Sequence, residues 1–164
     1  MKINRKDEDI RWDILNKYIC EIADRMGLAQ WRFILSHKRP PKDSGSIAYV
    51  RYSFQQRFFT LYFYDDFFTD TDMAYLREIV VHELCHVIEA SRLGVVDALR
   101  EEDIISQAFW KSWWGHYHRE RELAIDAFSR LIAPQMPLLD WTSISSRKGR
   151  CATKTKGVNN VLRL

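Results

Sequence analysis

The sequence predicts an α+β fold in which a small, twisted, mainly antiparallel sheet packs on helices. Three observations predict it. Apolar residues recur at steps of three or four positions near the start of the chain and again in its second half, as along amphipathic helices. Between these segments, three short runs alternate apolar and polar residues or are rich in β-branched and aromatic residues, as strands are. Strands grouped together, with helices before and after them, are typical of the α+β class.

The first helix is expected at residues 7–27, where apolar residues lie at four-residue steps and Gly27 ends the pattern. Strands are expected at residues 31–36, 47–53 and 58–64. The last two strands are close enough in sequence to form a hairpin.

A second helix is expected around residues 77–92. It follows an acidic stretch in which Asp70 or Thr71 can cap its start, and Gly94 lies just past its expected end. Most of its apolar side chains share one face, so the helix is expected to be largely buried.

Two more helices are expected, at residues 95–114 and 120–134, with Pro134 ending the second. Tryptophan, tyrosine and histidine residues crowd the boundary between them. This patch is expected either to contact a substrate or to form a turn between the helices.

The central motif is His-Glu-Leu-Cys-His at residues 82–86. On a helix, His82 and His86 leave the same face with their Cβ atoms about 6 Å apart, close enough to hold one ion. Glu83 then lies beside the metal and can take a proton from a bound water. Because a His-Glu-His group is costly to bury without a partner, the motif predicts a hydrolytic zinc site.

Such a zinc site has three protein ligands and an open position for water, so a third ligand is expected from another segment. Glu122 and Asp126 lie one turn apart on the edge of the last expected helix. One carboxylate can reach the metal while the other accepts a hydrogen bond from a ligating histidine.

Together, His82-Glu83-x-x-His86 and Glu122-x-x-x-Asp126 resemble the zinc metallopeptidases called gluzincins, the thermolysin-like clan, which include small phage and bacterial proteins of the ImmA/IrrE type. The resemblance implies a zincin-like fold and one zinc ion per chain, with ligands His82, His86 and Glu122. It also implies that Glu83 is the general base, that Asp126 braces a histidine, and that an edge strand pairs with extended peptide.

The resemblance covers roughly residues 75–134 and departs from the family in two respects. The 35 residues between the motifs exceed the link of the minimal members, and no family signature for the transition-state stabiliser is present. Candidates to donate a hydrogen bond to the oxyanion are His116, Tyr117 and His118.

Other residues remain alternatives for the third ligand, namely Glu120, His116 and His118. A histidine in this position would resemble the SprT-type proteases instead. Glu89 shares the metal face, but its position on the same helix makes it a poor third donor, and a solvated or ion-paired carboxylate is expected.

The expected function is zinc-dependent hydrolysis of a peptide or protein substrate. One alternative is a regulatory or protein-interaction module in which the zinc is structural or the peptidase is latent. Another is a nucleic-acid-associated protease of the SprT type, tethered by the end of the chain.

Charge divides the chain into an expected peptidase domain at residues 1–140 and a basic tail at 141–164. The tail contains six basic residues and no acidic residue, although the whole chain carries only +3. Such a tail can bind nucleic acid through counterion release, but it lacks interleaved aromatics, so a solvating tail is the simpler expectation.

Three cysteines at no disulfide-framework spacing favour a reduced, cytoplasmic setting. The first ten residues are polar and charged, and no apolar run approaches 18 residues, so neither a secretory signal nor a membrane span is expected.

Overall fold

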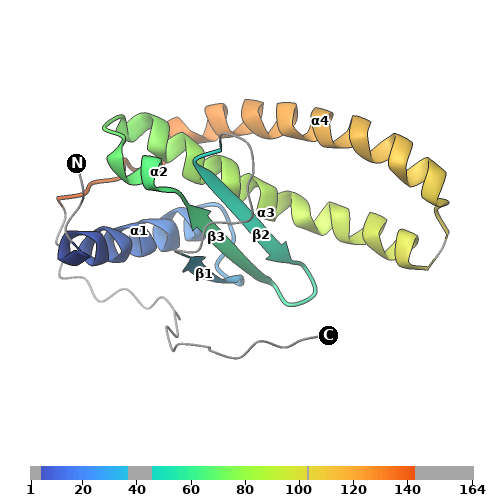
Figure 1. The fold of residues 1–164 in the computed structure, drawn as a ribbon, viewed down its shortest axis with the longest axis horizontal. Helices are drawn as coiled ribbons and strands as arrows, with labels where there is room; N and C mark the ends of the chain where they lie inside the picture. Colours follow the sequence, from blue (N-terminus) through green and yellow to red (C-terminus); the bar gives the residue numbers. More distant parts are fainter. Residues whose placement is uncertain (1–4, 37–45, 103, 143–164) are drawn as a thin grey trace.

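The computed structural model describes residues 5–36, 46–102 and 104–142 (Figure 1). The elements in chain order are α1 (Arg5–Arg25), β1 (Arg32–Ser36), β2 (Ala48–Ser53), β3 (Phe58–Phe63), α2 (Asp65–Thr69), α3 (Met73–Glu101), α4 (Gln107–Ile132) and the short 3-10 helix η1 (Ala133–Gln135). The expected α+β class is confirmed. The expected first helix and all three strands lie within two residues of their predicted bounds.

The sheet has the strand order β1-β3-β2 and is mixed. The hairpin strands β2 and β3 are antiparallel, whereas β1 pairs with β3 in parallel. The prediction of a mainly antiparallel sheet is therefore wrong. A parallel pair needs a connection of a dozen or more residues, and the chain from Ser36 to Phe58, which includes β2, supplies that length.

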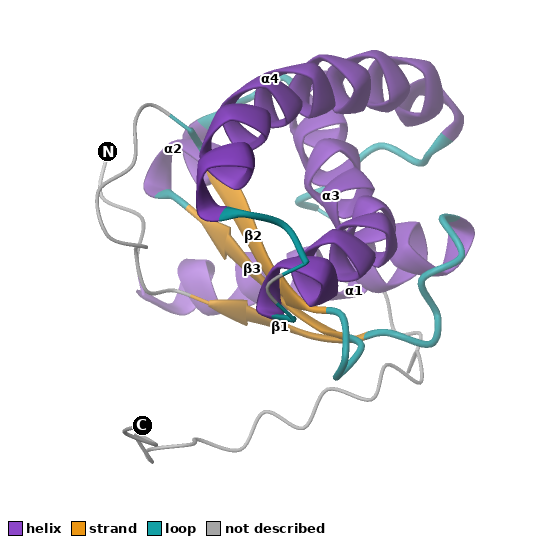
Figure 2. Cartoon of the chain, turned by 90° about the vertical axis from the view of Figure 1, so that its right-hand side faces the viewer, coloured by secondary structure: helices purple, strands orange, loops and turns teal. Residues whose placement is uncertain are grey.

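One face of the sheet forms the core. Alternate residues of β3, Phe59, Leu61 and Phe63, are buried, as the period of two in a strand requires. Helices α1 and α3 pack on this face (Figure 2), and Trp12 of α1 contacts Phe63 edge-on. The opposite face leaves side chains such as Tyr49 exposed.

Helix α3 begins at Asp72, whose carboxylate accepts hydrogen bonds from the backbone N–H groups of Ala74 and Tyr75. A carboxylate at this position satisfies backbone donors that have no partner within the helix and favours the positive end of its dipole. The cap is therefore Asp72 rather than the predicted Asp70 or Thr71.

The predicted end of α3 at Gly94 is wrong, because the helix continues through this residue to Glu101. A Cβ atom at Gly94 would lie 2.9 Å from Cδ1 of Phe54, in the turn between β2 and β3. The glycine therefore provides room for the hairpin turn against the helix instead of ending it.

Helix α4 starts at the cap Ser106 and passes without interruption through Gly115 to Ile132. The predicted helix at residues 95–114 is therefore divided between α3 and α4, which run antiparallel and side by side and extend beyond the sheet (Figure 1). Ala90 and Leu93 are the last buried apolar residues of α3, and none of the described residues from 94 to 124 is buried, so the projecting part of this helical hairpin is held by its own contacts.

Within the described residues, no helix is long and apolar enough to cross a membrane. Among the described residues Cys85 is a free, buried thiol, and the expectation of a reduced setting stays a prediction. The predicted tail lies outside the described residues from position 143 onward, while Trp141 packs against Phe67 and Phe68.

Candidate metal centre

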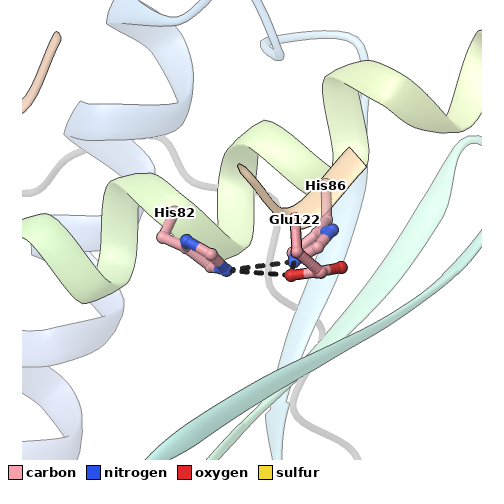
Figure 3. Close-up of side chains that lie close together, drawn as sticks. All are labelled: His82, His86 and Glu122. Carbon is pink, nitrogen blue, oxygen red and sulfur yellow. Dashed lines mark hydrogen bonds and ion pairs between the residues drawn. The ribbon is translucent and has the colours of Figure 1, made fainter. Parts of the chain in front are cut away.

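Three donor atoms converge between α3 and α4 (Figure 3). The Nε2 atoms of His82 and His86 are 3.1 Å apart, and Oε2 of Glu122 lies 3.7 Å from the first and 3.4 Å from the second. Among the described residues, this is the only group of three or more metal-ligating side chains whose donor atoms all lie within 4.8 Å of one another.

The spacing of these donors fits a zinc ion. Zinc–nitrogen bonds of about 2.0–2.1 Å at tetrahedral angles place neighbouring donor atoms about 3.3–3.4 Å apart. The three observed separations, 3.1, 3.4 and 3.7 Å, lie on both sides of that value. The group can therefore hold a divalent metal ion without rearrangement of the helices.

Asp126 orients one of the imidazoles. Its Oδ1 lies 3.0 Å from Nδ1 of His82, on the side of the ring away from the other donors. In the neutral imidazole, an Nδ1–H that donates to this carboxylate leaves the lone pair of Nε2 directed toward the centre. That is the tautomer a metal ion requires.

Packing fixes the faces of the two helices. In α3, Val81, Leu84 and Val87 are fully buried in the core, which turns the intervening histidines toward α4. In α4, Ile125 and Ser129 are the buried residues, and Glu122 and Asp126 lie on the same side of the helix. The side chains of His82 and His86 retain 22% and 12% exposure, so the centre is partly open to solvent.

Glu83 lies beside the donors, with only 7% of its surface exposed. Burial raises its pKa to about 7, although the charge of His82 and the backbone N–H of Val50 in β2 act in the opposite direction. A carboxyl group with a pKa near neutral pH can both take up and release a proton under those conditions.

The pKa values of the three donor residues are shifted in different directions. Burial acts to lower the pKa of His82, but its hydrogen bond with Glu122 and the surrounding carboxylates raise the pKa overall. Burial lowers the pKa of His86. Burial opposes ionisation of Glu122, yet hydrogen bonds from both histidines hold its pKa well below the ordinary value. A fully ionised carboxylate beside two imidazoles is a suitable set of donors for a divalent cation.

The other candidates for the third ligand lie outside the donor group. Glu120 is exposed and contacts Arg119 at 3.8 Å. His116 is also exposed, and its Nδ1 lies 3.2 Å from an Nη of the same arginine. His118 packs edge-on against Trp114. Of the alternatives weighed from the sequence, the structure therefore brings Glu122 to the histidines.

The aromatic patch lies on one side of α4 rather than in a turn. Tyr117 stacks on Trp113 with ring centroids 4.4 Å apart, and Trp110 stacks on Trp114 at 4.9 Å. The suggested role of Tyr117 and the adjacent histidines in stabilising an oxyanion stays a prediction.

Comparison of the chain with protein-family models, with curated proteins and with solved structures gave no match. The resemblance to gluzincins therefore rests on the residues of the two motifs alone. What the centre does follows from the chemistry of its donors and of the groups around them.

Proposed function

We propose that this protein is a zinc-dependent peptidase. The observation that carries the proposal is the convergence of His82, His86 and Glu122 with the buried carboxyl group of Glu83 next to them. Two imidazoles and one carboxylate leave an open position on a tetrahedral ion, which is the arrangement of hydrolytic zinc sites. A site for structural zinc is usually closed by four protein ligands.

The residues of the chain have separate roles in this proposal. The three donors would hold a zinc ion, which would supply Lewis-acid chemistry by lowering the pKa of a bound water toward about 7 and polarising a carbonyl group. Glu83 takes the proton from the attacking water and delivers it to the amine that leaves. Asp126 keeps His82 in the tautomer that binds metal.

Strand β2 provides a surface for the substrate backbone. It is an edge strand. The N–H of Tyr64 donates to the carbonyl of Ile47, so the backbone N–H and C=O groups of Ile47 and of every second residue after it point toward β3. The alternation of an antiparallel ladder then directs the backbone groups of Ala48, Val50 and Tyr52 to the outer edge. Two of these groups have partners within the chain, because the N–H of Val50 donates to Glu83 and the carbonyl of Ala48 accepts from the hydroxyl of Ser46. An extended peptide can pair there by strand addition, which depends little on its side chains.

The test is an assay of zinc-loaded protein with casein and with internally quenched peptides. The wild type should cleave, and Glu83→Gln should lose about 10²- to 10⁴-fold in kcat while binding one zinc ion. Glu78→Gln is the matched control, because this carboxylate lies on the same helix and pairs with Arg130 at the surface. Full activity in Glu83→Gln would refute the assignment of Glu83 as the base.

The same assay separates the alternatives. One zinc ion per chain without cleavage of any substrate would favour the non-catalytic module over the peptidase. The SprT-type alternative requires a histidine as third ligand or salt-sensitive DNA binding that disappears when residues 141–164 are removed. The position of the Glu122 carboxylate beside the two histidines supports the first proposal, and a DNA-binding measurement on the truncated chain tests the second condition.

A further inference from the structure

Arg121 connects the metal centre to the edge strand. It precedes Glu122 in α4, and its Nη2 donates a hydrogen bond of 3.4 Å to the hydroxyl of Tyr52 in β2. Neighbouring residues of one helix thus have different partners, since Glu122 meets the histidines of α3 while Arg121 meets the sheet.

The guanidinium of Arg121 retains unused hydrogen-bonding capacity. Its Nε is buried and has no hydrogen-bond partner, and the side chain takes part in no ion pair among the described residues. An arginine carries five N–H donors and a permanent charge. Because a buried donor without a partner is destabilising, an oxygen-rich partner in this region would be strongly favoured.

The charge of Arg121 acts at the centre of the site. Burial shifts the pKa values of Glu83 and His86 most, and the histidine hydrogen bonds outweigh burial at Glu122; the positive charge of Arg121 further lowers the pKa of each of the three. These residues are the proposed base and two proposed ligands. Tyr52, which holds the guanidinium, lies two residues along β2 from Val50, whose N–H acts on Glu83.

We propose that Arg121, held in place by Tyr52, donates a hydrogen bond to the carbonyl oxygen of the peptide bond being hydrolysed. This inference rests on the proposed peptidase function. When water adds to the carbonyl carbon, the electron pair of the C=O double bond moves onto the oxygen, and Glu83 receives the proton of the water. A fixed guanidinium stabilises the oxyanion more than the neutral carbonyl, and therefore lowers the barrier.

The experiment compares the steady-state kinetics of zinc-loaded wild type and variants on the quenched peptide that the wild type cleaves best. Arg121→Ala should lose about 10²- to 10³-fold in kcat with KM nearly unchanged, as expected for a donor that acts in the transition state. Tyr52→Phe removes one hydroxyl and should lose about tenfold, because the guanidinium is less well fixed. Arg130→Ala, on the same helix and 71% exposed, is the matched control and should match the wild type.

Two further readouts distinguish catalysis from a structural link between α4 and β2. Millimolar guanidinium should partly restore the kcat of Arg121→Ala but not that of Glu83→Gln. Arg121→Ala should also bind a phosphinic peptide, which carries a tetrahedral anionic group, more weakly than the wild type does, while binding a peptide hydroxamate equally well. Zinc content and thermal unfolding are measured for each variant and should equal those of the wild type.

The outcomes separate this inference from the proposed function. If the wild type cleaves and Arg121→Ala retains full kcat, the role of Arg121 is wrong and the peptidase proposal stands. A rise in KM confined to acidic peptides, with kcat intact, would also overturn it, because the arginine would then bind a permanent carboxylate. If the wild type cleaves nothing, both proposals fail.

Discussion

Nδ1 of His82 lies 3.0 Å from the carboxylate of Asp126, on the far side of the ring from the nitrogen that faces the other donors. The two residues belong to different helices, so this single contact links the packing of α3 on α4 to the orientation of a proposed ligand. Because metal affinity depends on the tautomer and on the ring orientation, the helix pair and the metal centre are expected to be thermodynamically coupled.

Removal of this contact should weaken zinc binding. We expect Asp126→Ala to lower zinc affinity by about 10- to 100-fold, because His82 loses the acceptor that fixes its tautomer. Competition titrations with a zinc-binding dye at pH 7.5 measure the effect. Asp140→Ala, an exposed aspartate outside the donor group, is the control. An unchanged affinity in Asp126→Ala would contradict a bracing role.

Glu122 should be essential for the metal, whereas its neighbour Glu120 should not. Glu122→Ala is expected to reduce bound zinc from one ion per chain to near zero after dialysis, because two imidazoles alone are a weak site. Elemental analysis checks this expectation. Glu120→Ala, which removes an exposed carboxylate two positions away, should retain one ion. The reverse result would show that the third ligand had been assigned to the wrong residue.

The stability of the metal-free protein should depend on pH through Glu83. Burial raises the pKa of this carboxyl group in the folded protein from 4.5 to about 7. The folded state therefore binds the proton more tightly than the unfolded state does. The resulting stabilisation is fully present below the unfolded pKa and is lost as pH rises through about 7.

Glu83→Gln removes that titration. The metal-free variant should be more stable than the metal-free wild type at pH 8, by up to about 3 kcal/mol, and the difference should shrink toward pH 5. Urea unfolding in the presence of a chelator at several pH values measures it. Glu78→Gln should leave the pH dependence unchanged, and parallel curves for Glu83→Gln and wild type would contradict the raised pKa.

The two glycines within the long helices should respond differently to alanine. At Gly115 an added Cβ meets nothing within 4 Å, so Gly115→Ala should stabilise the protein by about 0.5–1 kcal/mol through helix propensity. At Gly94 the same atom would lie 2.9 Å from the ring of Phe54. Gly94→Ala should therefore gain less or destabilise, as measured by thermal unfolding.

A double mutant tests the cause of this difference. In a Phe54→Ala background the ring is absent, so Gly94→Ala should stabilise as much as Gly115→Ala does. If Gly94→Ala behaves alike with and without the ring of Phe54, the close approach does not determine the effect.

Some predictions from the sequence failed because the same residue type is compatible with two different local structures. Glycine is the residue type expected just past the end of a helix, as at Gly94. Whether this glycine ends the helix or makes room for a nearby side chain depends on Phe54, which is forty residues away in the sequence. The strand order is another example. Each strand could be located from its own residues, but pairing of β1 with β3 depends on contacts between distant segments.

Part of the candidate site could likewise be predicted from the sequence, and part of it could not. The positions of His82 and His86 follow from helical periodicity, because four residues make little more than one turn. The choice of Glu122 over Glu120 could not be derived in this way, since each belongs to the same helix and only packing decides which one faces α3. Arg121 and Tyr52 were not identified at all, because no sequence spacing relates a strand to a helix 69 residues away.

By itself, the sequence determined the first helix, the three strands, the shared face of the two histidines and a short set of possible partners. These depend on periodicity and on the chemistry of single side chains, which act over one or two turns. Only the tertiary structure decided the strand order, the continuation of α3 past Gly94, the meeting of Glu122 with the histidines and the link from Arg121 to Tyr52. Each of these depends on how the burial of apolar surface brings distant segments together, and that is a property of the whole chain.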